Sequence, residues 1–302
     1  MDDEKGYRVK PPIFIIGNPR SGTTLLRLML NNHRHIVVPP ECGFAVWWYE
    51  RHKDWSKESN HNPQVVSRFL QDLSTSRKIE TWNLDFGALG KFIWSEEPSN
   101  YAELVSCVYV FFGNSLGRAF HRWGDKNNFH IDWIELLNEM FPSASFIHIT
   151  RDGRDVACSY KNLARMETGS KYAPRLPTDI VAIAAEWAGN VEKAISSFVA
   201  IGWDRVCEVR YEDLVENSQS LLRRVCDFLD EPYDDRMLRY YVHNREERQE
   251  PIEFLAWKSK TLEKPNTSEI GKFRRELTDE EVELFETHAR PLLVRYGYEC
   301  NA

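Results

Sequence analysis

The chain has 302 residues, of which 42% are hydrophobic and 28% charged, values typical of a folded globular protein that argue against disorder. Its net charge of −7 excludes a global basic field of the kind that attracts nucleic acid. An anionic ligand would therefore need a local cluster of donors.

The N-terminal stretch, residues 1–12, lacks the apolar core of a signal peptide. Since no run of ~18 apolar residues occurs, we expect no membrane span. The six scattered cysteines form no C-x-x-C pair, which favours reduced thiols over a disulfide framework or a zinc site. The expected location is cytoplasmic, and nothing in the sequence indicates the oligomeric state.

Short apolar strands alternate along the chain with amphipathic stretches, a pattern typical of an α/β protein whose parallel sheet is buried on both faces. In chain order we expect a strand at 12–16, a glycine turn at 17–22, a helix at 23–32, helices and loops over 42–122, a helix at 129–140, a strand at 144–150, a helix through 159, a helix at 178–199, a strand at 205–210, and helices at 218–229 and 278–297. The polar segment 243–277 is expected to be a loop. With no repeat or linker in sight, we predict one domain over 1–302, with a central parallel sheet flanked by helices.

Residues 42–122 are rich in aromatic side chains, among them Trp47, Trp82 and Trp94. Two interpretations stay open. The aromatics either form the core of a helical insertion, or they line a pocket for an acceptor substrate, because aromatic side chains dominate such walls.

The turn Gly17-x-x-x-x-Gly22-Thr23-Thr24 has the outline of a phosphate-binding loop, in which backbone N–H groups and a helix N-terminus receive an anion. A loop that serves a nucleoside triphosphate carries Lys where Thr23 stands. Asp152 is a weak candidate for a magnesium ligand. The sequence thus keeps a phosphate cradle without the groups that handle a triphosphate.

The run Pro-Arg-Ser-Gly-Thr-Thr-Leu-Leu from Pro19 resembles the 5′-phosphosulfate loop of sulfotransferases that use 3′-phosphoadenosine 5′-phosphosulfate (PAPS). The later run 146–159, Phe-Ile-His-Ile-Thr-Arg-Asp-Gly-Arg-Asp-Val-Ala-Cys-Ser, resembles the 3′-phosphate motif of that family. Residues 123–126, 210–214 and 270–274 resemble further family landmarks. The resemblance implies the P-loop NTPase-like sulfotransferase fold, with PAPS as cosubstrate, 3′-phosphoadenosine 5′-phosphate (PAP) as product, and no metal.

This resemblance also implies roles for individual residues. It places the 5′ phosphosulfate on Arg20, Ser21, Gly22, Thr23 and Thr24, and the 3′ phosphate on Arg151 and Ser159, with Tyr211 near the nucleotide. The family's Arg-Lys-Gly clasp for the 3′ phosphate is missing. Ser259, Lys260 and Lys272 lie in that region, and we take Lys272 as the substitute. The segment 243–277 is then expected to become ordered over bound nucleotide.

The acceptor hydroxyl needs a base, and Glu41 is the candidate, because its position resembles that of the catalytic glutamate of tyrosylprotein sulfotransferases. Lys126 and Arg20 are the candidates for stabilising the transferring group. The cytosolic sulfotransferases use a His two places after that Lys, where this chain has Asn128. The acceptor itself stays open: a small molecule, a lipid, a carbohydrate or a carrier-bound hydroxyl all fit.

Two other functions compete with this one. A P-loop kinase-like phosphotransferase is disfavoured by Thr23 in place of the loop Lys. A non-catalytic nucleotide-binding protein is disfavoured by the joint presence of Arg20, Glu41 and Lys126.

Overall fold

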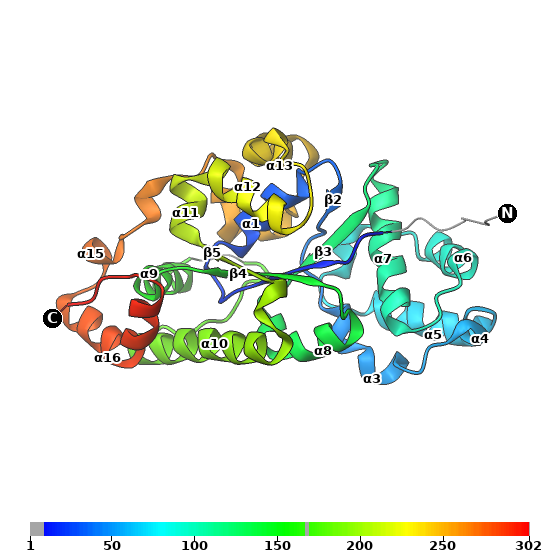
Figure 1. Ribbon diagram of the computed structural model, residues 1–302, viewed down its shortest axis with the longest axis horizontal. Helices are drawn as coiled ribbons and strands as arrows, with labels where there is room; N and C mark the ends of the chain where they lie inside the picture. Colours follow the sequence, from blue (N-terminus) through cyan, green and yellow to red (C-terminus); the bar gives the residue numbers. More distant parts are fainter. Residues whose placement is uncertain (1–8, 167–168, 302) are drawn as a thin grey trace.

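The computed structural model describes residues 9–166 and 169–301, so most of the stretch examined for a signal peptide lies outside the described residues. A five-stranded parallel sheet forms the centre, in the order β2-β3-β1-β4-β5. The strands are β1 (Ile13–Ile16), β2 (Ile36–Val37), β3 (Arg122–Lys126), β4 (Ser145–Thr150) and β5 (Val206–Arg210). The predicted α/β fold, a central parallel sheet flanked by helices, is confirmed (Figure 1).

Helices cover both faces of this sheet (Figure 1). Their bounds are α1 (Thr23–Asn31), α2 (Phe44–Trp47), α3 (Tyr49–His52), α4 (Lys57–Asn60), α5 (Pro63–Ser74), α6 (Phe86–Glu96), α7 (Tyr101–Ser115), α8 (Ile134–Met140), α9 (Gly153–Ala164), α10 (Ile180–Ile201), α11 (Tyr211–Glu216), α12 (Ser218–Phe228), α13 (Tyr240–Glu247), α14 (Ile252–Lys258), α15 (Phe273–Glu276) and α16 (Asp279–Arg295). Within the described residues, no helix combines the length and the apolar character needed to cross a bilayer.

Successive side chains of β1 enter two different hydrophobic layers, as the period of a strand requires. Ile13 and Ile15 pack in one cluster with residues of α1, α11 and α12, whereas Phe14 and Ile16 pack in another with residues of α7, α8 and α10. All four side chains are fully buried. A strand that is apolar on both faces therefore forms the middle of the sheet, which explains why its sequence is a continuous apolar run.

The chain order reverses at β1, which lies between β3 and β4. Because the strands are parallel, their carboxyl ends share one edge of the sheet, and ligands of open α/β sheets bind in the crevice at such a reversal. Every strand leads directly into a predicted site residue at that edge: β1 into the phosphate loop, β2 toward Glu41, β3 to Lys126, β4 to Arg151 and β5 to Tyr211.

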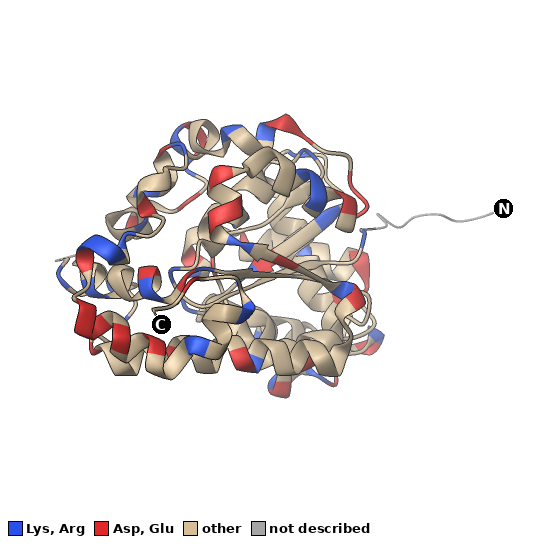
Figure 2. Ribbon diagram, turned by 60° about the vertical axis from the view of Figure 1, so that its left-hand side comes forward, with Lys and Arg blue, Asp and Glu red and all other residues tan. Residues whose placement is uncertain are grey.

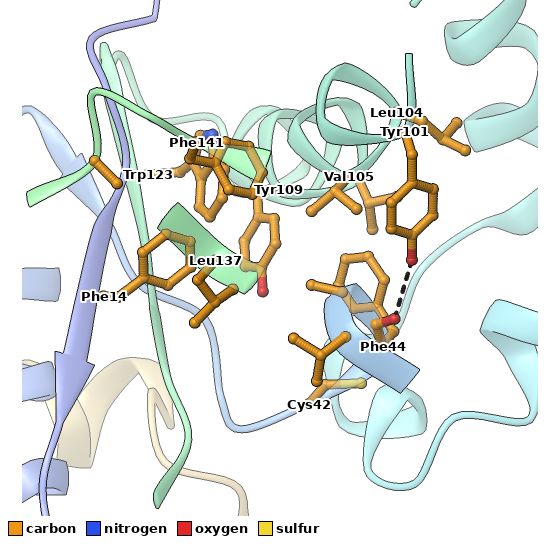
Figure 3. Close-up of a cluster of buried hydrophobic side chains, with 14 of the residues drawn as sticks. Phe14, Cys42, Phe44, Tyr101, Leu104, Val105, Tyr109, Trp123, Leu137 and Phe141 are labelled. Atoms are coloured by element: carbon orange, nitrogen blue, oxygen red, sulfur yellow. Dashed lines mark hydrogen bonds between the residues drawn. The ribbon is translucent and has the colours of Figure 1, made fainter. Parts of the chain in front are cut away.

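The aromatic side chains of region 42–122 mostly form core. Phe44, Trp82, Tyr101 and Tyr109 are buried in the same hydrophobic cluster as Phe14 of β1. Figure 3 shows this packing, including the hydroxyl of Tyr101, which donates a hydrogen bond to the carbonyl oxygen of Phe44 (3.3 Å). The helical region therefore packs on the edge of the sheet through its aromatic residues. That this arrangement is one domain over 1–302 stays a prediction.

Two expectations about local structure were wrong. The segment 243–277 is not a loop, because it holds α14, α15 and the end of α13; the apolar residues Phe254 and Trp257 of α14 lie at helical spacing and pack with Tyr172. In addition, β3 was not anticipated. Its sequence Arg-Trp-Gly-Asp-Lys is mostly polar, yet all five residues are buried, so a search for apolar runs misses it.

Candidate active site

The phosphate loop turns twice through the left-handed region, at Arg20 (φ 68°) and at Gly22 (φ 91°). Gly22 is the N-cap of α1, and no side chain caps the helix there. The first N–H groups of α1 are therefore available as donors, and the helix dipole favours an anion beside them. Ser21 is fully buried, and its hydroxyl has no hydrogen-bond partner in the part of the chain that the structure describes. Residues 20–24 thus place backbone N–H donors and the Ser21 hydroxyl at the start of α1, and that they hold an anion stays a prediction.

Lys126 and Glu41 meet at the start of α1. The ammonium group of Lys126 donates to the hydroxyl of Thr24 (3.2 Å) and forms an ion pair with Glu41 Oε1. The Lys126 side chain is almost completely buried, and burial lowers its pKa to about 8. Two of the three predicted catalytic residues are thus in direct contact beside the phosphate loop.

Glu41 contacts two further lysines that the sequence analysis did not single out. Lys78 Nζ lies 2.5 Å from Glu41 Oε2, and Lys258 Nζ lies 3.4 Å from Oε1. Burial alone would raise the pKa of Glu41, but Lys126, Lys258 and Lys78 together hold that pKa well below its usual value. The carboxylate is therefore ionised and surrounded by ammonium groups.

Behind Lys258 lies a second buried carboxylate. Glu250 Oε1 is 2.6 Å from Lys258 Nζ, and its other oxygen pairs with Arg27 of α1. The cluster thus contains four basic side chains (Arg27, Lys78, Lys126, Lys258) and two carboxylates (Glu41, Glu250). Acidic and basic residues are otherwise interspersed along the helices in Figure 2. The local excess of positive charge suits an anionic ligand.

Arg151, at the end of β4, is the centre of the second predicted anion site. Its guanidinium group lies 4.3 Å from the ring centroid of Tyr211, and it donates to the carbonyl oxygens of Glu269 (2.6 Å) and Arg20 (3.3 Å). The Tyr211 ring also contacts Gly22, where an added Cβ would come within 2.5 Å of the ring. Tyr211 therefore contacts both the phosphate loop and Arg151.

Arg20 and Ser159, which the sequence analysis assigned to opposite ends of the nucleotide, are neighbours. The Nε–H of Arg20 donates to the hydroxyl of Ser159 (3.0 Å), and its Nη2–H group donates to the carbonyl oxygen of Trp257 (3.3 Å). Burial, and then the charge of Arg151, lower the pKa of Arg20. Its side chain is thus aimed at α9 and α14, and within residues 9–166 and 169–301 it forms no hydrogen bond or ion pair with Glu41.

Lys272, the proposed substitute clasp, is buried and lies on the same side as Arg151. Its ammonium group is 3.1 Å from Glu269 Oε2, while the other oxygen of Glu269 pairs with Lys260. Burial would raise the pKa of Glu269, but Lys260 and Lys272 lower it to about 2. A carboxylate of the chain itself therefore neutralises the two lysines at this end.

The acidic residues of the second motif have structural partners. Asp152 accepts hydrogen bonds from the backbone N–H of Arg154 and from its guanidinium group. Asp155 accepts from the backbone N–H groups of Gly271 (2.8 Å) and Phe273 (3.0 Å) and so fixes the turn that carries Lys272. Asp152, the weak magnesium candidate, is occupied as a helix cap and ion-pair partner.

Among the described residues, one group of side chains could hold a metal ion: His33, His35 and Glu231. The group lies beside the amino ends of β2 and β3, at the opposite edge of the sheet from the predicted site. Both ring nitrogens of His33 have hydrogen-bond partners, the carbonyl oxygen of Pro232 and the N–H of His35. Glu231 pairs with Arg122 (3.1 Å). These existing bonds favour a structural role for the group.

One aromatic residue of region 42–122, Trp47, does lie near the site. The rings of Trp47 and Phe129 stack with centroids 5.4 Å apart, and both would collide with a Cβ at Gly43, two residues after Glu41. Trp47 is 41% exposed. Nearby, Asn128 accepts a hydrogen bond from the hydroxyl of Thr23 (3.1 Å), in the position where cytosolic sulfotransferases have their His.

Comparison with known proteins agrees with this geometry. A model described as "Sulfotransferase family" matches residues 11–235. Protein-tyrosine sulfotransferase A of Caenorhabditis elegans is 28% identical, over 99% of this chain and 70% of that protein. Two further relatives are covered over only 28% and 55% of their own lengths.

Solved structures show the same fold. The sulfotransferase domain of the Synechococcus PCC 7002 olefin synthase gives a TM-score of 0.60 at 22% identity, covering 99% of both chains. A mouse sulfotransferase complexed with PAP gives 0.51 at 12% identity, covering 95% of this chain and 89% of that one. The family match over residues 11–235 includes all five strands of the sheet. This chain therefore belongs to the sulfotransferase family.

Proposed function

We propose that the protein transfers a sulfuryl group from PAPS to an acceptor hydroxyl, with Glu41 as the base and Lys126 as the stabiliser of the leaving oxygen. The contact that carries this proposal is the ion pair of Glu41 and Lys126 beside the uncapped N-terminus of α1. A base, a cation and an anion cradle at one point are what an in-line transfer between two oxygens requires.

The acceptor oxygen forms a bond to sulfur while its proton passes to Glu41, and the bond between sulfur and the 5′-phosphate oxygen breaks. Lys126 and the N–H groups of α1 stabilise the negative charge that develops on that oxygen. The products are the sulfated acceptor and PAP. Arg20, which donates to Ser159, would support the phosphate side of the cradle rather than the base.

The two anion sites match the two charged ends of the nucleotide. The phosphate loop would receive the 5′ end, and Arg151 with Lys272 the 3′ phosphate, because charge-assisted hydrogen bonds from Arg and Lys are strong. The complex of the mouse structure with PAP supports a bisphosphate ligand for this fold. Ser159 would serve either end through Arg20.

The acceptor is proposed only as a hydroxyl. A relative bears the name of protein-tyrosine sulfotransferase and another that of an omega-hydroxy-beta-dihydromenaquinone-9 sulfotransferase. The Trp47–Phe129 stack near Glu41 favours an acceptor with a ring or an apolar body. A cavity of 440 Å³ is lined by Ser74, Thr75, Ser76, Arg77, Glu80, Lys171 and Tyr172. Its lining residue Arg77 directly precedes Lys78, a partner of Glu41.

The first test is calorimetric titration with PAP, followed by transfer from [³⁵S]PAPS to tyrosyl peptides, phenols and quinols. We expect a Kd on the order of micromolar, a loss of about 100-fold in Arg151→Ala, and unchanged PAP affinity in Glu41→Gln. Binding of ATP and magnesium in place of PAP would favour the kinase alternative. Binding of PAPS without transfer to any acceptor would favour a non-catalytic role.

A further inference from the structure

The segment from Gln249 to Lys258 lies against the phosphate loop and its helix. Arg27 of α1 donates to the carbonyl oxygen of Gln249 (3.1 Å), and Arg20 donates to that of Trp257 (3.3 Å). At the end of α14, Lys258 reaches Glu41. Three separate contacts thus bring a segment more than 200 residues away in the sequence to the predicted base.

Lys258 is held between two carboxylates in the interior. Its side chain is 9% exposed, and it lies 2.6 Å from Glu250 and 3.4 Å from Glu41. Glu250 is 1% exposed and also pairs with Arg27, whose side chain is equally buried. Because the desolvation cost of a buried ion pair cancels most of its attraction, such a chain contributes little to stability. A role in the chemistry of the site accounts better for its presence.

The charges that face Glu41 come from three elements. Lys126 ends β3, Lys258 ends α14, and Lys78 precedes the turn at residues 79–82. Behind Lys126 lie Asp125 and His130, with His130 Nε2 3.6 Å from Asp125 Oδ2, and behind Lys258 lies Glu250. Lys126 also donates to Thr24 of the phosphate loop, whereas the ammonium group of Lys258 donates to Glu41 and Glu250 and lies over the ring of Phe254.

We propose that Lys258 is a positioning residue for sulfuryl transfer. Its ammonium group holds Glu41 Oε1 next to Lys126 and, through Glu250 and Arg27, ties that carboxylate to the helix that carries the phosphate loop. Lys126 can then turn to the transferring group without leaving Glu41 free to rotate. The role assigned to Lys258 in catalysis rests on the proposed function of Glu41, but the contact itself can be tested without any acceptor.

The test follows the carboxyl resonance of Glu41 in protein labelled with [δ-¹³C]glutamate, assigned by its loss in Glu41→Gln. In Lys258→Met we expect the titration midpoint of Glu41 to rise by about one pH unit, because one of three nearby cations is gone. Lys258→Arg keeps the charge and should leave the midpoint close to that of the wild type. Lys264→Met, which removes an exposed lysine six residues further along the chain, is the matched control and should change nothing.

An unchanged midpoint in a folded Lys258→Met protein would overturn the proposal. If that variant does not fold, the ¹⁵Nζ resonance of Lys258 in the otherwise wild-type protein, assigned with Lys258→Arg, decides the matter. It should shift in Glu41→Gln, and the absence of a shift would overturn the contact.

Kinetics then separate this proposal from the function on which it rests. In Lys258→Met we expect the acid limb of the pH–rate profile to move to higher pH and kcat to fall on the order of tenfold, while the Kd for PAP stays within about twofold. An active wild type with the same profile in Lys258→Met would refute the positioning role alone. A wild type without transfer activity would refute the proposed function, whatever the titration shows.

Discussion

The two ends of the predicted nucleotide site are built differently. At the transfer end, basic side chains outnumber the carboxylates of their cluster, and most of them are deeply buried. At the far end, Glu269 already neutralises Lys260 and Lys272, and its backbone carbonyl accepts from Arg151. The transfer end therefore has an excess of positive charge, whereas the far end contains a carboxylate, that of Glu269, which balances its lysines.

The two ends would therefore bind the two charged groups of one ligand in different ways. The transfer end is preorganised, because its cations are fixed by buried ion pairs before any ligand arrives. At the far end, a nucleotide that binds as proposed would have to displace Glu269 from the lysines. This is where the expected ordering of segment 243–277 would act, in the part after α14. That expectation stays a prediction.

The largest effect is expected from a change at Lys126, in the transfer end. Lys126→Met removes the cation that contacts both Thr24 and Glu41, so we expect transfer from [³⁵S]PAPS to fall by about 100- to 1000-fold. PAP affinity, measured by calorimetry, should fall by only about tenfold, because PAP keeps the 5′-phosphate oxygen that Lys126 contacts but lacks the transferring group. Lys193→Met, an exposed lysine of α10, serves as control. A variant with normal turnover would show that the transfer end does not depend on this charge.

A second change tests the backbone of the same end. In Gly22→Ala the added methyl group would meet the Tyr211 ring at 2.5 Å in a left-handed backbone conformation, so the loop must shift. We expect PAP affinity to fall about 30-fold, since the helix N–H groups lose their alignment. Gly189→Ala, in α10 with open space around it, is the matched control and should bind PAP normally. Equal affinity in both variants would contradict the role of the loop.

The far end is tested by removing its built-in anion. Glu269→Gln frees Lys260 and Lys272, and we expect PAP to bind about tenfold more tightly, with turnover unchanged. Because Lys260 and Lys272 lower the pKa of Glu269 to about 2, acidification within the working range cannot substitute for this variant. Glu263→Gln, an exposed neighbour, is the control. Weaker binding in Glu269→Gln would mean that Glu269 instead orients the lysines for the ligand.

The smallest expected effect concerns Asp125, the buried neighbour of Lys126. Burial raises the pKa of Asp125 to about 7, above its value of 3.8 in the unfolded chain. As the pH rises from about 4 to 7 the unfolded state ionises first, so this residue makes the protein progressively less stable. Asp125→Asn should remove that trend and raise Tm at pH 7.5 by about 2–4 °C, with no gain at pH 4. Asp54→Asn, on the surface, should show no such pH dependence; a constant difference at all pH values would contradict the assignment.

The sequence predicted those parts of the site that follow strands within recognisable motifs. Arg151 and Tyr211 come directly after strands and Arg20 lies in the loop that follows β1, and parallel topology alone brings such residues to one edge. Glu41 and Lys126 were found by resemblance, and the structure places them in contact. The fold class could be predicted because β1 is a continuous apolar run and β4 is apolar at three of its six positions.

The remaining parts depend on tertiary packing. Lys78 and Lys258 lie 37 and 217 residues from Glu41, in segments whose local sequence carries no motif. The segment of Lys258 was expected to be a loop, because residues 243–277 are largely polar and include Pro251 and Pro265. The strand β3 escaped notice because its buried charges are satisfied by partners, such as Glu231 for Arg122, that only the folded chain supplies.

The position of the Tyr211 ring has a consequence for which nucleotides can fit. The ring packs against Gly22 of the phosphate loop, and the guanidinium group of Arg151 lies over it. Because Arg151 also donates to the carbonyl oxygen of Arg20, the ring and the guanidinium group together fix the loop against the end of β4. The separation of the two predicted anion sites is therefore set before any ligand binds, which would favour nucleotides whose two phosphoryl groups match it.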